Sequence, residues 1–251
     1  MGKLVPQDPG DEPANRLLKN IQLEKKAVIV ERKKLDKLRH FDTDDEFPFK
    51  LPSQWEWARL GETAISGPSN GISPKPAPVE TPYRCLTLSA TTRGTFNNQC
   101  FKFVDIDADT ASKFFLKEGD LLIQRANSID YVGVSAIYDG PDDQFIFPDL
   151  MMRLRISDYL SRSFVHAYLS SMMGRSYFRN HASGTQGNMP KINQGTVVNA
   201  PIPIPPFPEQ NRIVAKIDQL MAVCNQLKSR LTEARQLNEQ LASTLVEQAV
   251  A

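Results

Sequence analysis

The side chains that most often perform chemistry are few and scattered in this chain. Its three histidines have no metal-ligand spacing to one another or to the cysteines: His40, His166 and His181. Carboxylates gather only at Asp105, Asp107 and Asp109 and at Asp142 and Asp143, in turn-rich segments where solvated acids are expected. No GxxxxGK[ST] phosphate loop and no GxGxxG turn occurs. The sequence therefore predicts a non-catalytic protein with no metal and no cofactor of its own.

Composition and cysteine usage indicate an ordinary globular protein. The 251 residues are 41% hydrophobic and 8% aromatic, enough for one substantial domain with helical appendages. Three well-separated cysteines, Cys85, Cys100 and Cys224, favour reduced thiols over a disulfide framework. The N-terminus is polar, and no apolar run approaches the roughly 20 residues of a membrane span. We expect a cytoplasmic protein with no membrane partner.

Positive charge is concentrated in one stretch of a nearly neutral chain. The net charge is +1, but residues 151–191 carry six Lys or Arg side chains against one Asp, which gives +5. A local basic surface of this kind suits phosphate contact, although a solvated helix face would give the same pattern.

The elements that must position these residues fall into three predicted parts. Residues 1–46 comprise a proline-marked start, a helix from about Ala14 to Arg39 and a linker. Residues 47–207 mix short strands, loops rich in Gly, Pro, Asn and Asp, and one helix that runs from a Ser157 N-cap through Phe178. Residues 208–251 form a distal helix. The fold class is α+β, with one loop-rich domain between two helical arms.

The distal helix carries a coiled-coil pattern. Apolar residues recur at steps of four and three over about five heptads, and Asn238 lies on the same seam, where a buried amide can fix the register. At about 1.5 Å per residue this helix would be roughly 55 to 60 Å long. Such a stripe must pack against another helix, or against its own domain as a surface helix. The predicted helix contacts of both arms are Leu17, Ile21, Ile213, Ile217, Leu220, Leu227, Leu231, Asn238 and Leu241.

Four stretches, in order, resemble the specificity subunit of type I restriction-modification systems. They are GKLVPQDPGDEPANRLL near the N-terminus, FPFKLPSQWEWARLGE, the strand EGDLLI followed by Arg125, and SGTQGNMPKINQGTVVNAPIPIPPFPEQNRIVAKID. Each stretch alone is weak, but the ordered set frames nearly the whole chain. The chain is identified as a relative of these subunits with a single target-recognition domain, either as a C-terminal fragment or as a natural half-subunit.

The resemblance implies a function and a set of partners. Members of the family use two recognition domains, separated by two antiparallel helices, to direct methyltransferase (modification) subunits and restriction subunits to a bipartite site on double-stranded DNA. S-adenosylmethionine is expected on the modification subunit. A half-subunit would have to form a homodimer in which each proximal helix pairs with a distal one, and protein symmetry would then impose a symmetric site.

Base edges in DNA are read by side chains with hydrogen-bond donors and acceptors, and loops are where a rigid domain presents them. Arg125 follows an apolar strand and should emerge at the edge of a sheet. Arg175, Arg179 and Lys191 would contact phosphates without reading sequence. The complete set of candidate DNA-binding residues is Asn70, Lys75, Arg93, Arg125, Asn127, Ser128, Tyr131, Arg175, Arg179, Asn188 and Lys191.

Two other classes of function stay open. One is a coiled-coil scaffold or adaptor that does not bind DNA. The other is a free-standing methyltransferase or nuclease, for which the chain offers neither a glycine-rich cofactor strand nor an (N/D)PP(Y/F) tetrapeptide.

Overall fold

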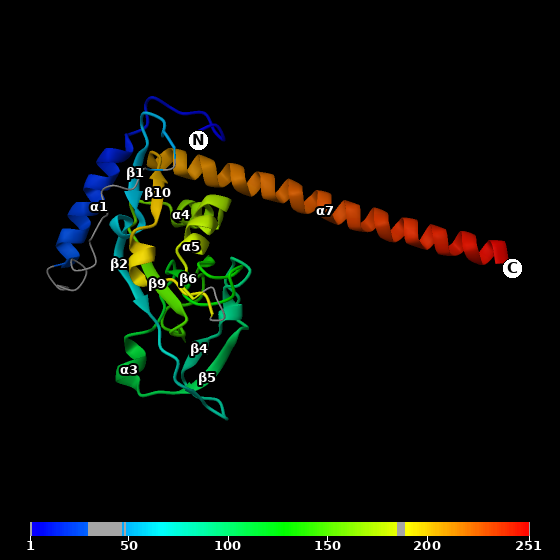
Figure 1. Ribbon diagram of the computed structural model, residues 1–251, viewed down its shortest axis with the longest axis horizontal. Helices are drawn as coiled ribbons and strands as arrows, with labels where there is room; N and C mark the ends of the chain where they lie inside the picture. Colours follow the sequence, from blue (N-terminus) through cyan, green and yellow to red (C-terminus); the bar gives the residue numbers. More distant parts are fainter. Residues whose placement is uncertain (1, 30–46, 48, 185–188, 251) are drawn as a thin grey trace.

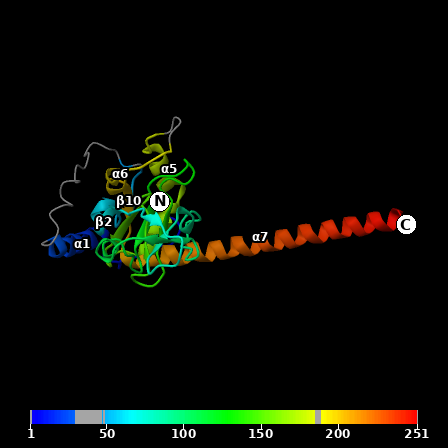
Figure 2. The ribbon, with the colours of Figure 1, turned by 90° about the horizontal axis from the view of Figure 1, so that it is seen from below.

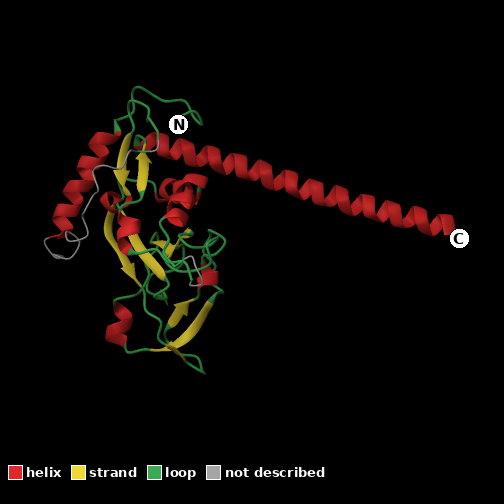
Figure 3. Cartoon of the chain, viewed as in Figure 1, coloured by secondary structure: helices red, strands yellow, loops and turns green. Residues whose placement is uncertain are grey.

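The computed structural model describes residues 2–29, 47, 49–184 and 189–250. Its body begins with α1 (Ala14–Ile29), β1 (Glu56–Arg59) and α2 (Leu60–Thr63). A strand-rich centre follows: β2 (Ala64–Asn70), β3 (Lys75–Pro76), β4 (Arg84–Leu86), the 3-10 helix η2 (Leu88–Ala90), β5 (Phe101–Asp105), α3 (Ala108–Ser112), β6 (Leu121–Gln124), β7 (Ser135–Ile137), β8 (Phe145–Ile146) and β9 (Met151–Ile156). The chain ends with α4 (Arg162–Ser170), α5 (Met172–Asn180), α6 (Gln194–Val198), β10 (Pro201–Ile204) and α7 (Phe207–Val250). Figure 3 shows the mixture of short elements and loops that the composition predicts.

Three small sheets organise the body. The central sheet has the strand order β2-β9-β6-β7, and a second four-stranded sheet has the order β3-β5-β4-β8. The third is the antiparallel pair β1-β10, which places Trp57 opposite Pro203. The two ends of the domain therefore lie side by side. Figure 1 shows β4, β5 and α3 at the end of the body opposite this pair.

One hydrophobic core joins α1, the central sheet and the later helices. Leu154, Val165 and Ile202 are fully or almost fully buried in it, and Leu17 and Ile21 of α1 belong to the same cluster. The buried ammonium of Lys25 donates to the carbonyl oxygens of Gly61 and Glu62 at 2.6 and 3.3 Å, which satisfies free carbonyls at the end of α2. The first helical arm is thus part of the body.

Two predicted helices differ from those observed. The helix expected from Ala14 begins there, but residues 30–39 of that prediction lie outside the described residues. The single helix expected from Ser157 is wrong, because the chain forms α4 and α5 with N-caps at Ser161 and Ser171. The Ser157 hydroxyl instead hydrogen-bonds the Glu24 carboxylate on α1. That contact ties α1 to the turn that follows β9.

The last helix leaves the body almost at once. α7 has 44 residues and is therefore about 66 Å long. Figures 1 and 2 show it projecting away from the body on the side opposite α1. The helical arms are therefore unequal, because one packs on the domain and the other extends from it.

Candidate nucleic-acid interface

Loops from four parts of the chain meet beyond the carboxyl end of β6. We call residues 69–73, 88–94, 124–131 and 189–194 the loop cluster. Arg125 donates its backbone N–H to Leu150 O at 2.7 Å, and its own carbonyl accepts from Ile192 N at 2.9 Å. Asn127 N donates to Pro190 O at 3.3 Å. The backbone itself therefore joins the segment after β6 to the segment before α6.

The other two segments join through side chains. Asn70, at the end of β2, accepts a hydrogen bond from Gln194 Nε2 at 3.4 Å. Gln124 Nε2 donates to Leu88 O at 2.9 Å and so holds the 88–94 segment against β6. Lys75 is placed differently, in β3 of the second sheet opposite Asp105. These contacts bring most of the predicted DNA-binding residues into the loop cluster, whereas Lys75 lies outside it, in β3.

The loop cluster is cationic. It contains Arg93, Arg125 and Lys191 against the single acid Asp130. Among the described residues none of these three cations forms an ion pair, and Arg93 and Lys191 are exposed. Arg125 is half-buried and donates from Nη1 to Asp149 O at 3.3 Å, which leaves most of its five N–H donors for a ligand. Unpaired arginine and lysine on loops are the groups that contact phosphates and guanine edges.

Two arginines of α5 extend this cationic surface. Arg175 donates from Nη2 to Asp130 O at 2.8 Å and so ties α5 to the 124–131 segment. Its Nη1 is buried and has no hydrogen-bond partner in the described part of the chain. Burial, and then the neighbouring charge of Arg179, lower the pKa of the Arg175 guanidinium below its ordinary value. Arg175 thus links α5 to the loop cluster, and its contact with a phosphate stays a prediction.

The remaining candidates have mixed placements. Ser128 and Tyr131 are exposed on the 124–131 segment. Asn127 is half-buried and uses both ends of its amide inside the protein, donating to Gln124 Oε1 at 2.7 Å and accepting from Ser128 N at 2.7 Å. Asn127 therefore holds the loop through its own amide, and its contact with DNA stays a prediction. Asn188 lies outside the described residues.

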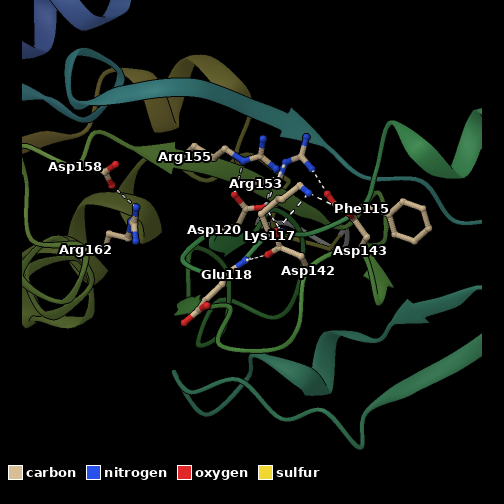
Figure 4. A network of polar contacts seen from close by, with 10 residues as sticks. All are labelled: Phe115, Lys117, Glu118, Asp120, Asp142, Asp143, Arg153, Arg155, Asp158 and Arg162. Carbon is tan, nitrogen blue, oxygen red and sulfur yellow. Dashed lines mark hydrogen bonds and ion pairs between the residues drawn. The ribbon is translucent and has the colours of Figure 1, made fainter.

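The basic stretch 151–191 is only partly available to a ligand. Figure 4 shows Arg153 and Arg155 of β9 turned toward the Asp120 carboxylate. Arg155 Nε donates to Asp120 Oδ1 at 2.7 Å, and Lys117 N donates to Asp120 Oδ2 at 2.9 Å. Arg162 forms an ion pair with Asp158, four residues earlier in the sequence. Half of the local positive charge therefore stabilises the fold and does not form a phosphate-binding surface.

Asp120 and Gln124 have structural roles that the sequence did not predict. Asp120 is almost fully buried and Gln124 is fully buried, one at each end of β6. The sequence does indicate that both residues are buried, because each flanks the continuous apolar run Leu121–Ile123. The contacts could not be predicted, since their partners lie 33 or more residues away for Asp120–Arg155 and Gln124–Thr91.

Three polar side chains, Glu209, Gln210 and Arg212, fix the first turns of α7 to the body. Trp55 Nε1 donates to Glu209 Oε2 at 2.9 Å. Burial raises the pKa of the Glu209 carboxyl above its ordinary value, although the hydrogen bond from Trp55 acts in the opposite direction. Gln210 accepts from Ser161 N at 2.9 Å and donates to Pro205 O at 2.9 Å. Arg212 Nη2 donates to Asp11 Oδ2 at 2.6 Å. The PPFPEQ motif is therefore a joint that sets the direction in which the helix leaves the body.

The residues predicted to form helix contacts fall into a buried group and an exposed group. Leu17, Ile21 and Ile213 are buried within the molecule, which corrects the prediction that they meet a partner helix. Ile217 packs beside Ile213 and is half-buried. The rest of the seam is exposed on α7: Leu220, Leu227, Leu231, Asn238 and Leu241. Among the described residues of the predicted seam, the exposed apolar ones therefore all lie on α7.

The described residues include no group of three or more His, Cys, Asp or Glu placed to hold a metal ion. Burial raises the pKa of the Cys85 thiol to about 11, which makes it a poor nucleophile. None of the described helices is long and apolar enough to cross a membrane. What the loop cluster offers chemically is an array of hydrogen-bond donors and cations on a fixed frame.

Comparisons with known proteins define the class of the chain. The family described as "Type I restriction modification DNA specificity domain" matches residues 52–235. The chain is 34% identical over 255 residues to the Type I restriction enzyme EcoEI specificity subunit of Escherichia coli, and 33% identical over 261 residues to the EcoAI specificity subunit of Escherichia coli. Each alignment covers 100% of this chain but only 43% and 42% of the relative. The chain belongs to the type I restriction-modification specificity family and spans less than half the length of these relatives.

Solved structures share the fold. One aligns with a TM-score of 0.56 at 20% identity and is described as the structural basis underlying complex assembly and conformational transition of the type I R-M system. It covers 88% of this chain and 52% of the other. The HsdS subunit from Thermoanaerobacter tengcongensis aligns with a TM-score of 0.50 at 20% identity, over 86% of this chain and 48% of that one. The predicted α+β class with a helix before the domain and a long helix after it is confirmed.

Proposed function

We propose that the chain reads one part of a bipartite DNA site on behalf of a type I restriction-modification enzyme, and that it performs no catalysis itself. The observation that carries this proposal is the loop cluster, in which Arg93, Arg125 and Lys191 form no ion pair with any described residue while backbone and side-chain hydrogen bonds join the loops. Membership of the specificity family supports DNA as the ligand. In this account the methyl donor, S-adenosylmethionine, is bound by a separate modification subunit, and a restriction subunit joins the same assembly.

The two parts of the molecule have different tasks in this function. The loop cluster contacts base edges, and Arg175, Arg179 and Lys191 hold neighbouring phosphates. α7 spaces and docks the domain, because its apolar stripe needs a second helix to cover it. We infer that a second copy of this chain can supply that helix. A scaffold that binds no DNA would have no use for unpaired arginines on converging loops, so this alternative is less well supported.

Substitution of Arg125 by alanine tests the reading role. The assembled complex should bind a duplex with its recognition motif more tightly than a duplex in which one base pair of the motif is altered. We expect this preference to fall about 10- to 100-fold, since a bidentate arginine–guanine contact is worth about 1–3 kcal/mol. Competition binding with both duplexes at one fixed salt concentration measures this ratio.

Arg162→Ala is the matched control, because it removes the same charge from α4, where Arg162 pairs with Asp158 and lies outside the loop cluster. We expect this control to keep the wild-type preference. An Arg125→Ala complex that discriminates as well as the Arg162→Ala complex would remove Arg125 from the reading surface.

A further inference from the structure

Gln124 is a polar side chain in a position where an apolar one would be expected. It ends β6, follows three buried apolar residues and is itself fully buried. Its backbone is already used in the sheet, since Gln124 N donates to Val134 O and Gly133 N donates to Gln124 O, both at 2.8 Å. An amide buried here is unfavourable unless its side chain is fully hydrogen-bonded. The side chain must therefore be explained by its own contacts.

Those contacts form a chain that runs in one direction through two loops. Ser128 N donates to Asn127 Oδ1, and Asn127 Nδ2 donates to Gln124 Oε1, both at 2.7 Å. Gln124 Nε2 then donates to Thr91 Oγ1 at 3.0 Å and Thr92 Oγ1 at 3.1 Å. The Thr92 hydroxyl in turn donates to Leu88 O at 2.8 Å. The two hydrogens of Gln124 Nε2 therefore have acceptors in the 88–94 segment, where Leu88 O also lies at 2.9 Å, and Gln124 Oε1 accepts from Asn127, so both ends of the buried amide are hydrogen-bonded.

The two joined loops come from different parts of the fold. The 88–94 segment lies between β4 and β5 and carries Arg93, whereas the 124–131 segment lies between β6 and β7 and carries Arg125. The buried amide is a direct side-chain link between them. At the far end of the second segment, Gly133 has a φ of 74°, and a side chain there would clash with Phe178. The 124–131 segment is therefore held at both ends.

We propose that Gln124 is a positioning residue that fixes the Arg93 loop against the Arg125 loop, and that this alignment sets which base pairs the domain accepts. The inference rests on the proposed DNA-reading function and adds a residue that touches no DNA itself. A binding site that needs two loops at once loses selectivity when their relative position is free, because the right contacts are then no longer preformed. Contacts to phosphates tolerate such movement, since they carry no sequence information.

Gln124→Glu is the sharpest test, because it keeps the shape and the Oε1 acceptor but replaces the two Nε2 hydrogens with a second acceptor. The full chain, assembled with its modification subunit, is used to select duplexes from a pool of randomised DNA, and the enriched sequences are read. We expect the wild type to enrich a motif, and the variant to enrich it at least about tenfold less strongly. Binding to an unrelated duplex should change by no more than about threefold.

Gln99→Glu is the matched control, because it makes the same chemical change at an exposed position whose Nε2 donates to the exposed Asn98 side chain. Thr92→Val removes one acceptor of the chain without burying a charge, and it should give an intermediate loss even where Gln124→Glu fails to fold. A residue that only stabilised the fold would lower the melting temperature and leave selectivity intact. A wild-type motif retained by Gln124→Glu and Thr92→Val overturns this inference alone, whereas a wild type that enriches no motif overturns the proposed function and the inference with it.

Discussion

Replacing Asp120 by alanine is expected to lower the free energy of unfolding by about 3 kcal/mol, because it removes a buried carboxylate that forms ion pairs with two arginines. Asp120 is 1% exposed, while Arg153 and Arg155 are 13% and 33% exposed. Removing one partner of a buried ion pair costs about 3–5 kcal/mol, and the partial exposure of Arg155 places this case at the lower end. The Lys117 N–H also loses its acceptor. Urea unfolding of the variant and the wild type measures the difference.

Asp139→Ala is the control for that experiment. Asp139 is an exposed acid close in sequence to the same network, and removing its charge should change the free energy of unfolding by less than about 0.5 kcal/mol. A loss of less than about 1 kcal/mol for Asp120→Ala would mean that the ion pairs drawn in Figure 4 do not hold β6 to β9 in solution.

The largest effect on assembly is expected from two charges on the α7 stripe. Leu227 and Leu231 are 59% and 55% exposed on the isolated chain, although their spacing is that of a coiled-coil seam. In a dimer paired through α7, Leu227→Glu with Leu231→Glu would bury unpaired carboxylates. We expect the association constant to fall by more than about 100-fold. Sedimentation at micromolar concentration should show a dimer for the wild type and a monomer for this variant.

Ser229→Glu with Gln236→Glu adds the same charges on the opposite side of α7, about 160° to 180° around the helix at 100° per residue. This control should sediment as the wild type does. A monomeric wild type at the same concentration, with no other protein present, would contradict pairing between two copies of this chain.

Much of the fold follows from local patterns in the sequence. The strand at Trp57, the β6 strand at Leu121 and the root of the last helix at Pro208 appear where alternation, an apolar run and a proline in the first turn predict them. The one long helix predicted after Ser157 fails for a local reason. Two serines, Ser161 and Ser171, each cap a new helix with the side-chain oxygen, and the helix is broken at the second of them.

The candidate site was less predictable because charge alone does not show which cations are paired. Arg125 and Arg155 look alike in sequence, yet the first follows β6 in the loop cluster, whereas the second lies on β9 and pairs with the buried Asp120. Leu17 and Leu227 have the same spacing within their helices, but only the first finds a core in its own domain. In both pairs the deciding partner is distant in sequence, so only tertiary structure separates binding residues from structural ones.

The central claim is that this chain selects the DNA sequence on which its enzyme acts. Mapping of methylated bases across a genome tests it most directly, in cells that carry the neighbouring modification subunit with this chain or without it. The account predicts a bipartite methylated motif that appears only when the chain is present and weakens with Arg125→Ala. Methylation of the same motif in both strains would contradict it.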